Sequence, residues 1–395
     1  MEIRDYEYIL IPNILEKYKC SMSGECCQSK WRIDIDEQSY LETKKNLENQ
    51  KEDINTYMEK HESGSYVSKF SNGYCKFITE DKKCRVHKDF GWECLSDTCK
   101  IYPRNLKLTS RGMEIGMGFS CRSSAKLLLS KEKFYIKKIK KEDYFFMKPR
   151  SVSFIIPENN LKKEIASRYY ELEEMAIDIL NLDEKLDIKL KYLEKVISEL
   201  YTINIEEYDF KKNVENFKEL ALNLSDNSEN LEDEIVKIIL EKQKRSKSVG
   251  LYYINLLRII RLNKNLELDK KILGSDSFTL TSEELKELKE VWNKEYDRIL
   301  QNYFLCLIFN KEMYYNAEYF MMKATMLTIF LKFRILLNIK YLGRELTEEE
   351  LIYTIKSHDE DLAHDSEFFS EFYKTKCEEK VNISDLIKKL LTLIS

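Results

Sequence analysis

Hydrophobic positions in the second half of the chain recur at the spacing of one helix face. Between residues 285 and 300 they lie mostly three or four positions apart, as Leu285, Leu288, Val291, Trp292, Tyr296, Ile299 and Leu300. This period places the side chains along one side of an α-helix. Thr281 and Thr347, each followed three residues later by a glutamate, have the pattern of a capping box and are expected to open two helices.

Helix-breaking residues are scarce in the same region. All four prolines and seven of the ten glycines lie at or before Pro157. The residues after it are rich in Lys, Glu and Leu, which favours continuous helices. Breaks are expected near residues 263–265, at Gly274 and at Gly343. We therefore predict that residues 151–395 form an all-helical array of about eight helices.

The first 150 residues show shorter and more varied patterns. Residues 31–36 alternate with period two, which predicts a short strand that leads into a helix over residues 37–51. The runs 105–109 and 113–117 flank a turn at Ser110 to Gly112 and predict a β-hairpin.

Two further elements are expected before the helical region. One is a helix from Ser120 or Cys121 to Leu129, and the other is an extended segment at Phe154. The sequence therefore predicts a mainly α protein with two domains. A small irregular α+β, cysteine-rich metal domain covers residues 1–150, and an all-helical domain covers residues 151–395.

The balance of charge limits the expected partners. The chain has 65 basic and 69 acidic residues and a formal net charge of −4, whereas nucleic-acid binders usually have a basic excess. The basic clusters Lys131–Lys141 and Lys242–Lys247 have acidic neighbours and are interpreted as solvated helix faces. The most apolar stretch, Tyr319–Leu337, contains three basic residues, so we expect a buried helix and no membrane span.

Cysteine is concentrated near the N-terminus. Eight of the ten cysteines are Cys20, Cys26, Cys27, Cys75, Cys84, Cys94, Cys99 and Cys121. Thiols gather either as disulfides or as ligands of a thiophilic metal. The polar N-terminus has no apolar signal core, so the expected location is cytoplasmic, where thiols stay reduced. Metal binding is therefore favoured over disulfides.

The spacing of these cysteines favours an iron–sulfur cluster over zinc, and both stay open. Zinc sites usually use cysteines with two to four residues between them. The spacings here are five residues after Cys20, eight after Cys75 and four after Cys94, which together are loose for zinc. The adjacent Cys26 and Cys27 are expected to direct their side chains apart, so that both do not bind one small ion. A cluster with several irons tolerates scattered ligands better. Either metal would stabilise loops that are poor in apolar residues.

The cysteines lie in short blocks of sequence. The blocks are Lys19-Cys20-x5-Cys26-Cys27, Tyr74-Cys75-Lys76-Phe77, Lys83-Cys84-Arg85-Val86-His87, Leu95-x3-Cys99-x2-Tyr102-Pro103-Arg104 and Ser120-Cys121-x3-Ala125. In this order they resemble the flagellin lysine-N-methylase family over roughly residues 15–130. The first four blocks also resemble the wider superfamily of iron- or zinc-chelating cysteine-cluster domains. The chain departs from the family in lacking an extra cysteine before Cys26 and in having Lys76 where proline is usual.

The resemblance implies an enzyme that transfers a methyl group from S-adenosyl-L-methionine to lysine side chains of flagellin. It also implies a [4Fe-4S] cluster in the N-terminal domain, with ligands drawn from Cys20, Cys26, Cys27, Cys75, Cys84, Cys99 and Cys121. The best-matching blocks supply four thiolates, the number that such a cluster needs: Cys27, Cys75, Cys84 and Cys99. Cys94 is interpreted as a packed thiol, and Cys306 and Cys377 as core residues on helices.

Methyl transfer to lysine requires a neutral amine, so the site must lower the lysine pKa or supply a base. Asp97, Tyr102 and Arg104 are candidates for contacts with substrate or with the surroundings of the cluster, and structural capping of the cluster loop is an equal alternative. The sequence has neither a G-x-G-x-x-G turn nor a C-x3-C-x2-C triplet. The cluster is therefore expected either to bind the methionine end of the cofactor through an open iron or to hold the domain together.

Two other functions fit the same residues. One is a metal-stabilised scaffold whose helical array docks a partner without catalysis. The other is a redox protein that uses the cluster itself to transfer electrons. Binding of S-adenosyl-L-methionine and methylation of flagellin would distinguish the enzyme from both.

Overall fold

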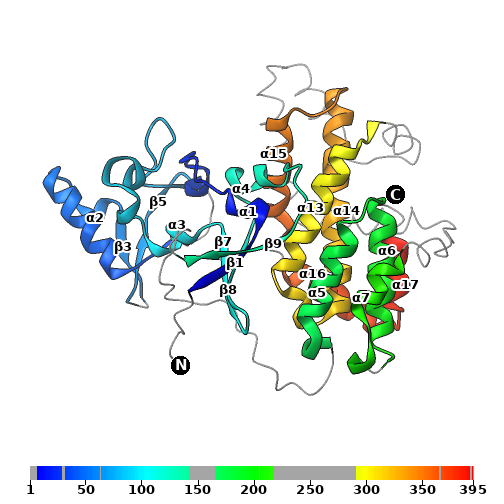
Figure 1. The fold of residues 1–395 in the computed structure, drawn as a ribbon. Helices are drawn as coiled ribbons and strands as arrows, with labels where there is room; N and C mark the ends of the chain where they lie inside the picture. The colour runs from blue at the N-terminus through cyan, green and yellow to red at the C-terminus, as the bar shows by residue number, and fades with distance from the viewer. Residues whose placement is uncertain are drawn as a thin grey trace. The chain divides into compact units, whose positions relative to one another are not determined.

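The computed structural model describes residues 7–28, 32–62, 64–141, 165–203, 205–217, 291–363, 366–391 and 394, which belong to two compact units (Figure 1). The first, called the cysteine-rich unit, takes its residues from 1–11, 15–124 and 138–155. The second, called the helical unit, takes its residues from 12–14, 125–137 and 156–395. The described chain is mostly helical, and its sheets use residues from the first 140. The mainly α fold class is therefore confirmed.

A four-stranded sheet with the order β7-β8-β1-β9 belongs largely to the cysteine-rich unit. The strands β7 (Arg104–Thr109) and β8 (Gly112–Met117) form the predicted antiparallel hairpin. Gly112 follows the turn with a φ of 125°, which glycine adopts without steric cost. The strand β1 (Tyr8–Pro12) runs parallel to β8, and β9 (Ile136–Lys140) is the edge strand next to β1.

A smaller antiparallel sheet precedes this hairpin in the chain. Its order is β2-β4-β3, and a separate two-stranded hairpin is formed by β5 and β6. Helix α2 (Glu37–Asn49) begins directly after β2, because the Asp36 carboxylate accepts a hydrogen bond of 3.0 Å from the Ser39 amide. The predicted strand followed by a helix is therefore confirmed. The strands are β2 (Asp34–Ile35), β3 (Met58–Lys60), β4 (Tyr66–Ser68), β5 (Phe70–Ser71) and β6 (Tyr74–Cys75).

Short helical turns carry most of the cysteine blocks. Cys26 and Cys27 lie in the 3-10 turn η1, and Cys99 lies in α3, which Ser96 caps. The predicted helix after Cys121 is present as α4, but it ends at Leu127. The short elements are α1 (Asn13–Glu16), η1 (Glu25–Gln28), η2 (Ile54–Thr56), the π-helical turn η3 (Val86–Phe90), η4 (Trp92–Cys94), α3 (Asp97–Ile101) and α4 (Arg122–Leu127).

The helical unit is organised around the long helix α14 (Ala317–Leu342). Its interior side chains are almost all buried, and it contacts α6, α13, α15 and α17 (Figure 1). Within the described residues, the other helices of this unit are α5 (Tyr169–Leu180), α6 (Leu186–Leu200), α7 (Phe210–Glu215), α13 (Lys294–Phe309), α15 (Glu348–His358), α16 (Ser366–Glu378) and α17 (Ile383–Leu391). The same ranges contain the short turns η6 (Ile165–Arg168), η7 (Ile205–Glu207), η8 (Glu312–Tyr314) and the π-helical η9 (Asp359–Ala363).

Local signals predicted several features of this unit. The stretch Tyr319–Leu337 is the buried helix α14, and Gly343 ends it at a φ of 65°. Thr347 opens α15 with a complete capping box. One interpretation was wrong, because residues 136–140 of the Lys131–Lys141 cluster form strand β9 and not a helix face. Thr281, residues 263–265, Gly274, Phe154 and Lys242–Lys247 lie outside the described residues.

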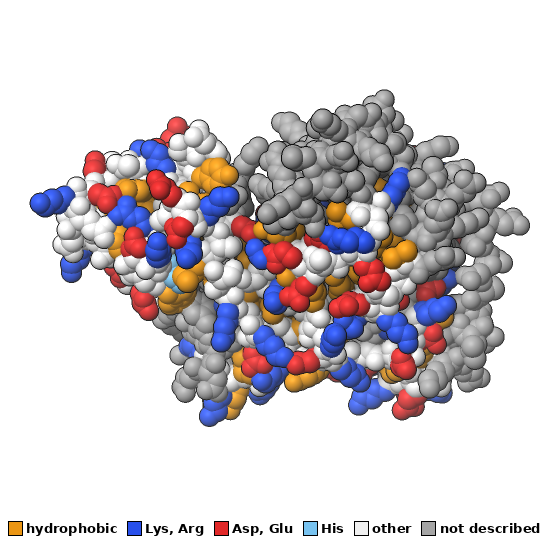
Figure 2. Space-filling view, turned by 90° about the horizontal axis from the view of Figure 1, so that it is seen from above, with side chains coloured by type: hydrophobic (Ala, Val, Ile, Leu, Met, Phe, Trp, Pro, Cys, Tyr) orange, Lys and Arg blue, Asp and Glu red, His pale blue; other side chains and the backbone are white. Residues whose placement is uncertain are grey.

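The described surface carries charge of both signs. On the face that Figure 2 shows, acidic and basic side chains are interspersed over the described residues. This distribution agrees with the formal net charge of −4. Among the helices of the described ranges, none combines the length and the apolar character that crossing a membrane requires.

Candidate metal centre

Seven cysteine side chains from separate parts of the cysteine-rich unit approach one another. All ten cysteines of the chain are free thiols. Within the unit, Cys27 and Cys75 are buried, Cys26, Cys84, Cys99 and Cys121 are partly buried, and Cys20 is exposed.

Cys27 and the three thiols that it contacts are called the thiol core: Cys26, Cys27, Cys75 and Cys84. The Cys27 thiol lies within hydrogen-bonding reach of each of the other three. Cys26 and Cys27 therefore direct their side chains to the same place, and the prediction that they diverge was wrong. The physical reason is the tight 3-10 turn that holds both residues, where adjacent side chains do not alternate as they do in a strand.

The other three thiols surround the thiol core. Cys99 lies within electrostatic range of Cys26, Cys84 and Cys75, and Cys121 lies within range of Cys26. Cys20 lies within range of Cys26, Cys121 and Cys84. All seven cysteines that the sequence blocks single out are thus brought to one region.

The remaining cysteines lie elsewhere. Cys94 packs against the hydrophobic core of the unit and accepts a hydrogen bond of 3.4 Å from the Asn46 amide, in agreement with a packed thiol. Cys306 is buried on α13, as predicted. Cys377 is exposed on α16, so its interpretation as a core residue was wrong. Cys377 continues the four-residue spacing of Phe369 and Tyr373, but it lies in the last turn of α16, where most side chains are exposed.

Proton sharing dominates the ionisation of the thiol core. The pKa of Cys27 is raised because its proton is shared with Cys26, Cys75 and Cys84. The same hydrogen bond lowers the pKa of Cys75 to about 7, and Ser68 and the Phe77 amide contribute in the same direction. The pKa values of Cys26 and Cys84 are lowered for the same first reason. Contact with Cys27 therefore favours the thiolate form, which binds metals, at Cys26, Cys75 and Cys84.

Backbone amides also point at the sulfur atoms. The amides of Val86 and His87 donate to Cys84, and the amide of Phe77 donates to Cys75. The Ser68 hydroxyl lies 2.9 Å from the Cys75 sulfur. Such donors stabilise the negative charge of a thiolate. In metal sites they also orient the ligands and change the reduction potential of the metal.

Outside the thiol core the same kind of contact recurs. The Met22 amide donates to the Cys20 sulfur at 3.4 Å, and the amides of Ser124 and Ser123 donate to Cys121. Burial is nevertheless the larger influence on both groups, and it raises the pKa of Cys20 and of Cys121. These two thiols therefore stay protonated more readily than the thiolates of the core.

The donor set fits a thiophilic metal. Four cysteine thiolates are the usual ligands of structural zinc and of iron–sulfur clusters. Over the ranges that the structure describes, no group of three or more Cys, His, Asp or Glu side chains already has the spacing of a metal site. The core thiols instead hydrogen-bond to one another, so binding requires them to lose the shared proton and move apart around the metal.

The three candidate catalytic residues occupy the edge of this region. Asp97 begins α3, and its amide donates to the Asp36 carboxylate at 3.0 Å. The Tyr102 hydroxyl lies 3.1 Å from the Ser120 hydroxyl. Both contacts hold backbone segments together, which is the structural alternative stated for these residues.

Arg104 contacts Tyr18, and Tyr18 contacts one of the thiols. The sequence analysis did not single out Tyr18. The Arg104 guanidinium lies 4.6 Å from the centre of the Tyr18 ring, and the Tyr18 hydroxyl lies 3.7 Å from the Cys121 sulfur. Burial raises the pKa of Tyr18, so its hydroxyl keeps the proton. The position of Tyr18 two residues before Cys20 was the available signal, but proximity in sequence alone does not show a contact with Cys121.

Comparisons with known proteins cover a small part of the chain. It is 30% identical over 105 residues to a protein named lysine-N-methylase from Salmonella typhimurium, which corresponds to 24% of this chain and 25% of that protein. It is also 30% identical over 102 residues to a protein named flagellar biosynthetic protein FliU from Salmonella muenchen, covering 24% of this chain and 60% of that protein. No family model and no solved structure matches. The chain therefore spans a quarter of the first relative and less than two thirds of the second.

Proposed function

We propose that the protein is an S-adenosyl-L-methionine-dependent N-methyltransferase that acts on lysine side chains of flagellin in the cytoplasm. The observation that carries the proposal is the meeting of seven cysteines, from five separate sequence blocks, around the thiol core. The partial similarity to a protein named lysine-N-methylase supports the reaction, and the similarity to a protein named for flagellar biosynthesis supports the substrate.

The proposal includes a [4Fe-4S] cluster held by cysteines of the cysteine-rich unit. Cys27, Cys75 and Cys84 belong both to the best-matching sequence blocks and to the thiol core. Cys26 and Cys99 compete for the fourth position, because Cys26 contacts Cys27 and Cys99 lies near three of the core thiols. When bound, a cluster with three cysteine ligands would supply a Lewis-acidic iron, and a cluster with four would supply a structural link between the loops.

The protein's own residues would prepare this centre in three ways. Ser68 and the Phe77 amide orient Cys75 and stabilise its charge. The hydrophobic side chains around the thiols, including Leu47 and Val86, limit the access of water. Cys20 is the exposed member of the set, so a ligand from solution would approach the centre from its side.

One preparation tests the centre and the reaction together. Protein purified without oxygen should contain iron and sulfide and show a broad visible absorption, and it should add methyl groups to flagellin, detected by mass spectrometry, when S-adenosyl-L-methionine is present. Cys99→Ser should lower the iron content and the activity. Cys94→Ser is the matched control and should change neither, because the Cys94 thiol contacts Asn46 and its charged neighbours are Glu42, Glu93 and Lys100. Equal iron content in both variants would exclude Cys99 as a ligand and leave Cys26 in the fourth position.

A metal-stabilised scaffold is the second candidate function. It is favoured by the position of Cys27 and Cys75 within the hydrophobic core of the unit, where a metal can replace missing apolar packing. A scaffold should retain its metal and bind flagellin with equal affinity whether or not S-adenosyl-L-methionine is present, and it should leave the mass of flagellin unchanged.

A further inference from the structure

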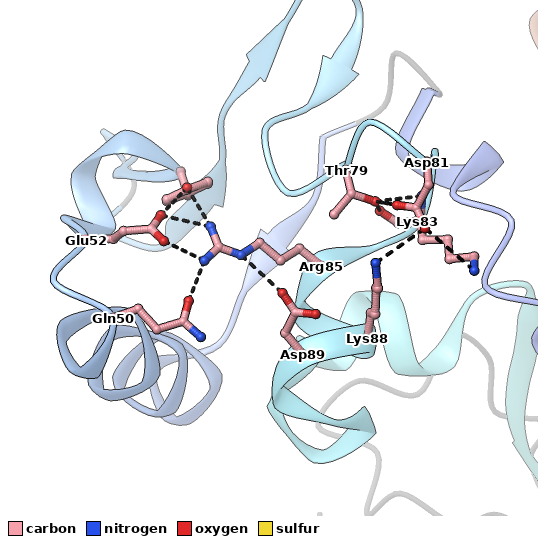
Figure 3. Close-up of polar contacts among 9 residues, drawn as sticks. Gln50, Glu52, Thr79, Asp81, Lys83, Arg85, Lys88 and Asp89 are labelled. Carbon is pink, nitrogen blue, oxygen red and sulfur yellow. Dashed lines mark hydrogen bonds and ion pairs between the residues drawn. The ribbon is translucent and has the colours of Figure 1, made fainter.

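Arg85, which follows Cys84 in the sequence, makes several polar contacts through its guanidinium (Figure 3). Both oxygens of the Glu52 carboxylate accept from its guanidinium, at 2.8 Å and 2.6 Å. The Tyr57 hydroxyl lies 2.8 Å from the same group, and the Gln50 side-chain oxygen accepts a further hydrogen bond. On the other side, Asp89 lies 3.5 Å from Nε. Three elements of the unit are thus joined through one side chain.

These contacts differ from those of an ordinary surface ion pair. The Arg85 side chain is only 18% exposed. Its guanidinium lies 5.6 Å from the centre of the Tyr57 ring and 5.8 Å from that of the Phe90 ring. The Arg85 guanidinium also lowers the pKa of Glu52 to about 2, with help from Tyr57. A bidentate pair packed between aromatic rings holds its geometry much better than an exposed pair of flexible chains.

A nearby network on the same segment provides the contrast (Figure 3). Lys88 and Lys83 both pair with Asp81, at 3.3 Å and 3.6 Å. All three side chains are close to half exposed. Pairs of this kind contribute little to stability. Residues 83–88 therefore carry one anchored cation, Arg85, and two weakly held ones, Lys83 and Lys88.

The anchored residue lies where two ligand loops meet. The Arg85 amide donates to the Phe77 carbonyl at 2.8 Å, while the Phe77 amide donates to the Cys75 sulfur. The next two amides after Arg85, those of Val86 and His87, donate to the Cys84 sulfur. The direction of these amides depends on the backbone of residues 84–87, which the Arg85 side chain ties to the end of α2 and to the loop after it.

We propose that Arg85 is a positioning residue for the metal centre. By locking residues 84–87 against Glu52, Tyr57 and Gln50, it fixes the backbone that carries Cys84 and its two amide donors, so that the Cys84 side chain turns to the metal from a rigid support. The inference rests on the proposed metal centre and adds to it a residue outside the ligand set. Lysine cannot replace this function fully, because an ammonium cannot bind both Glu52 oxygens, Tyr57 and Gln50 in one plane.

The test compares iron retention in full-length variants. Protein is reconstituted with ferrous iron and sulfide, and the release of iron to an excess of a ferrous chelator is followed by loss of the visible absorption. Arg85→Met should release iron about ten-fold faster than the unchanged protein, in the range known for residues that support metal ligands. Arg85→Lys and Glu52→Gln should give smaller increases. Lys88→Met, which removes a cation from the same segment, should release iron at the unchanged rate.

A second measurement separates positioning from general destabilisation. Loss of amide donors to a cluster sulfur changes the electron density at the iron, so the reduction potential and the electron paramagnetic resonance spectrum should shift in Arg85→Lys and Glu52→Gln even where the protein is fully folded. Equal release rates for Arg85→Met and Lys88→Met, or unchanged spectra in the milder variants, would overturn the inference and leave the metal centre standing. Failure of the unchanged protein to take up iron and sulfide would overturn both.

Discussion

His358, the last residue of α15, is completely buried against the ring of Tyr303. Within the described ranges, neither of its ring nitrogens has a hydrogen-bond partner. Burial lowers its pKa well below the ordinary value, and the charge of Arg334 lowers the pKa further. Arg334 in turn forms an ion pair of 2.9 Å with Asp361. The folded protein therefore keeps the imidazole neutral.

We predict that this histidine makes the helical unit less stable in mild acid. Above about pH 6.5 the imidazole is neutral in the folded and the unfolded chain, so it adds no pH dependence. Below that pH only the unfolded chain takes up the proton readily. The free energy of unfolding should then fall by up to about 1.4 kcal/mol per pH unit through this group.

Urea denaturation near neutral pH and about one to two units lower, followed by circular dichroism, measures this slope. His358→Phe keeps an aromatic ring in the same place and should remove this part of the pH dependence. The Arg334–Asp361 pair is present in both proteins, so their difference reports on His358. The same slope in parent and variant would exclude the histidine as its source.

At the scale of elements, α15 offers a well-defined local test. Its capping box uses two bonds: the Glu350 amide donates to the Thr347 hydroxyl at 3.4 Å, and the Thr347 amide donates to the Glu350 carboxylate at 2.7 Å. Thr347→Ala removes the acceptor at the N-cap and should lower the free energy of unfolding by about 1 kcal/mol. Thr347→Ser keeps the hydroxyl and should lie within a few tenths of a kcal/mol of the parent. Chemical denaturation of the three proteins would show no difference if the cap were unimportant.

The sequence predicted those elements whose signals lie within a few residues of one another. The capping box of α15, the helix α2 after Asp36 and the hairpin of β7 and β8 all depend on residues close together in the chain, and each was predicted. The parallel pairing of β1 with β8 joins residues about a hundred positions apart, and no local pattern encodes it.

In the candidate site, too, some features were predictable from the sequence and others were not. The cysteine blocks identified the seven thiols that approach one another, because residue type and order are visible in the sequence. The side-chain directions of Cys26 and Cys27 were not visible, since they depend on the turn η1. The contacts of Tyr18 with Cys121 and of Arg85 with Glu52 join segments that are distant in sequence, so no local pattern predicts them. The chemistry of the site was thus more predictable than its surroundings.

At the scale of the whole molecule, the two units should respond differently to loss of metal. The thiol core belongs to the hydrophobic core of the cysteine-rich unit, whereas the helical unit has its own buried interior around α14. Removing the metal with a chelator should therefore loosen the first unit only. Hydrogen exchange should become faster in peptides that cover residues 20–28 and 75–87. Equal acceleration in peptides of α14 would mean that the two units unfold together.

Because the chain passes between the two units more than once, a single cut does not produce either unit alone. Residues 12–14 and 125–137 belong to the helical unit, although the cysteine-rich unit continues on both sides of each segment. A fragment that ended after Ser124 would lack β9, and β1 would become an edge strand with unpaired backbone groups. Unpaired edge strands pair with strands of other molecules, so such a fragment should aggregate although it keeps all seven cysteines. A soluble fragment would have to include β9 paired with β1.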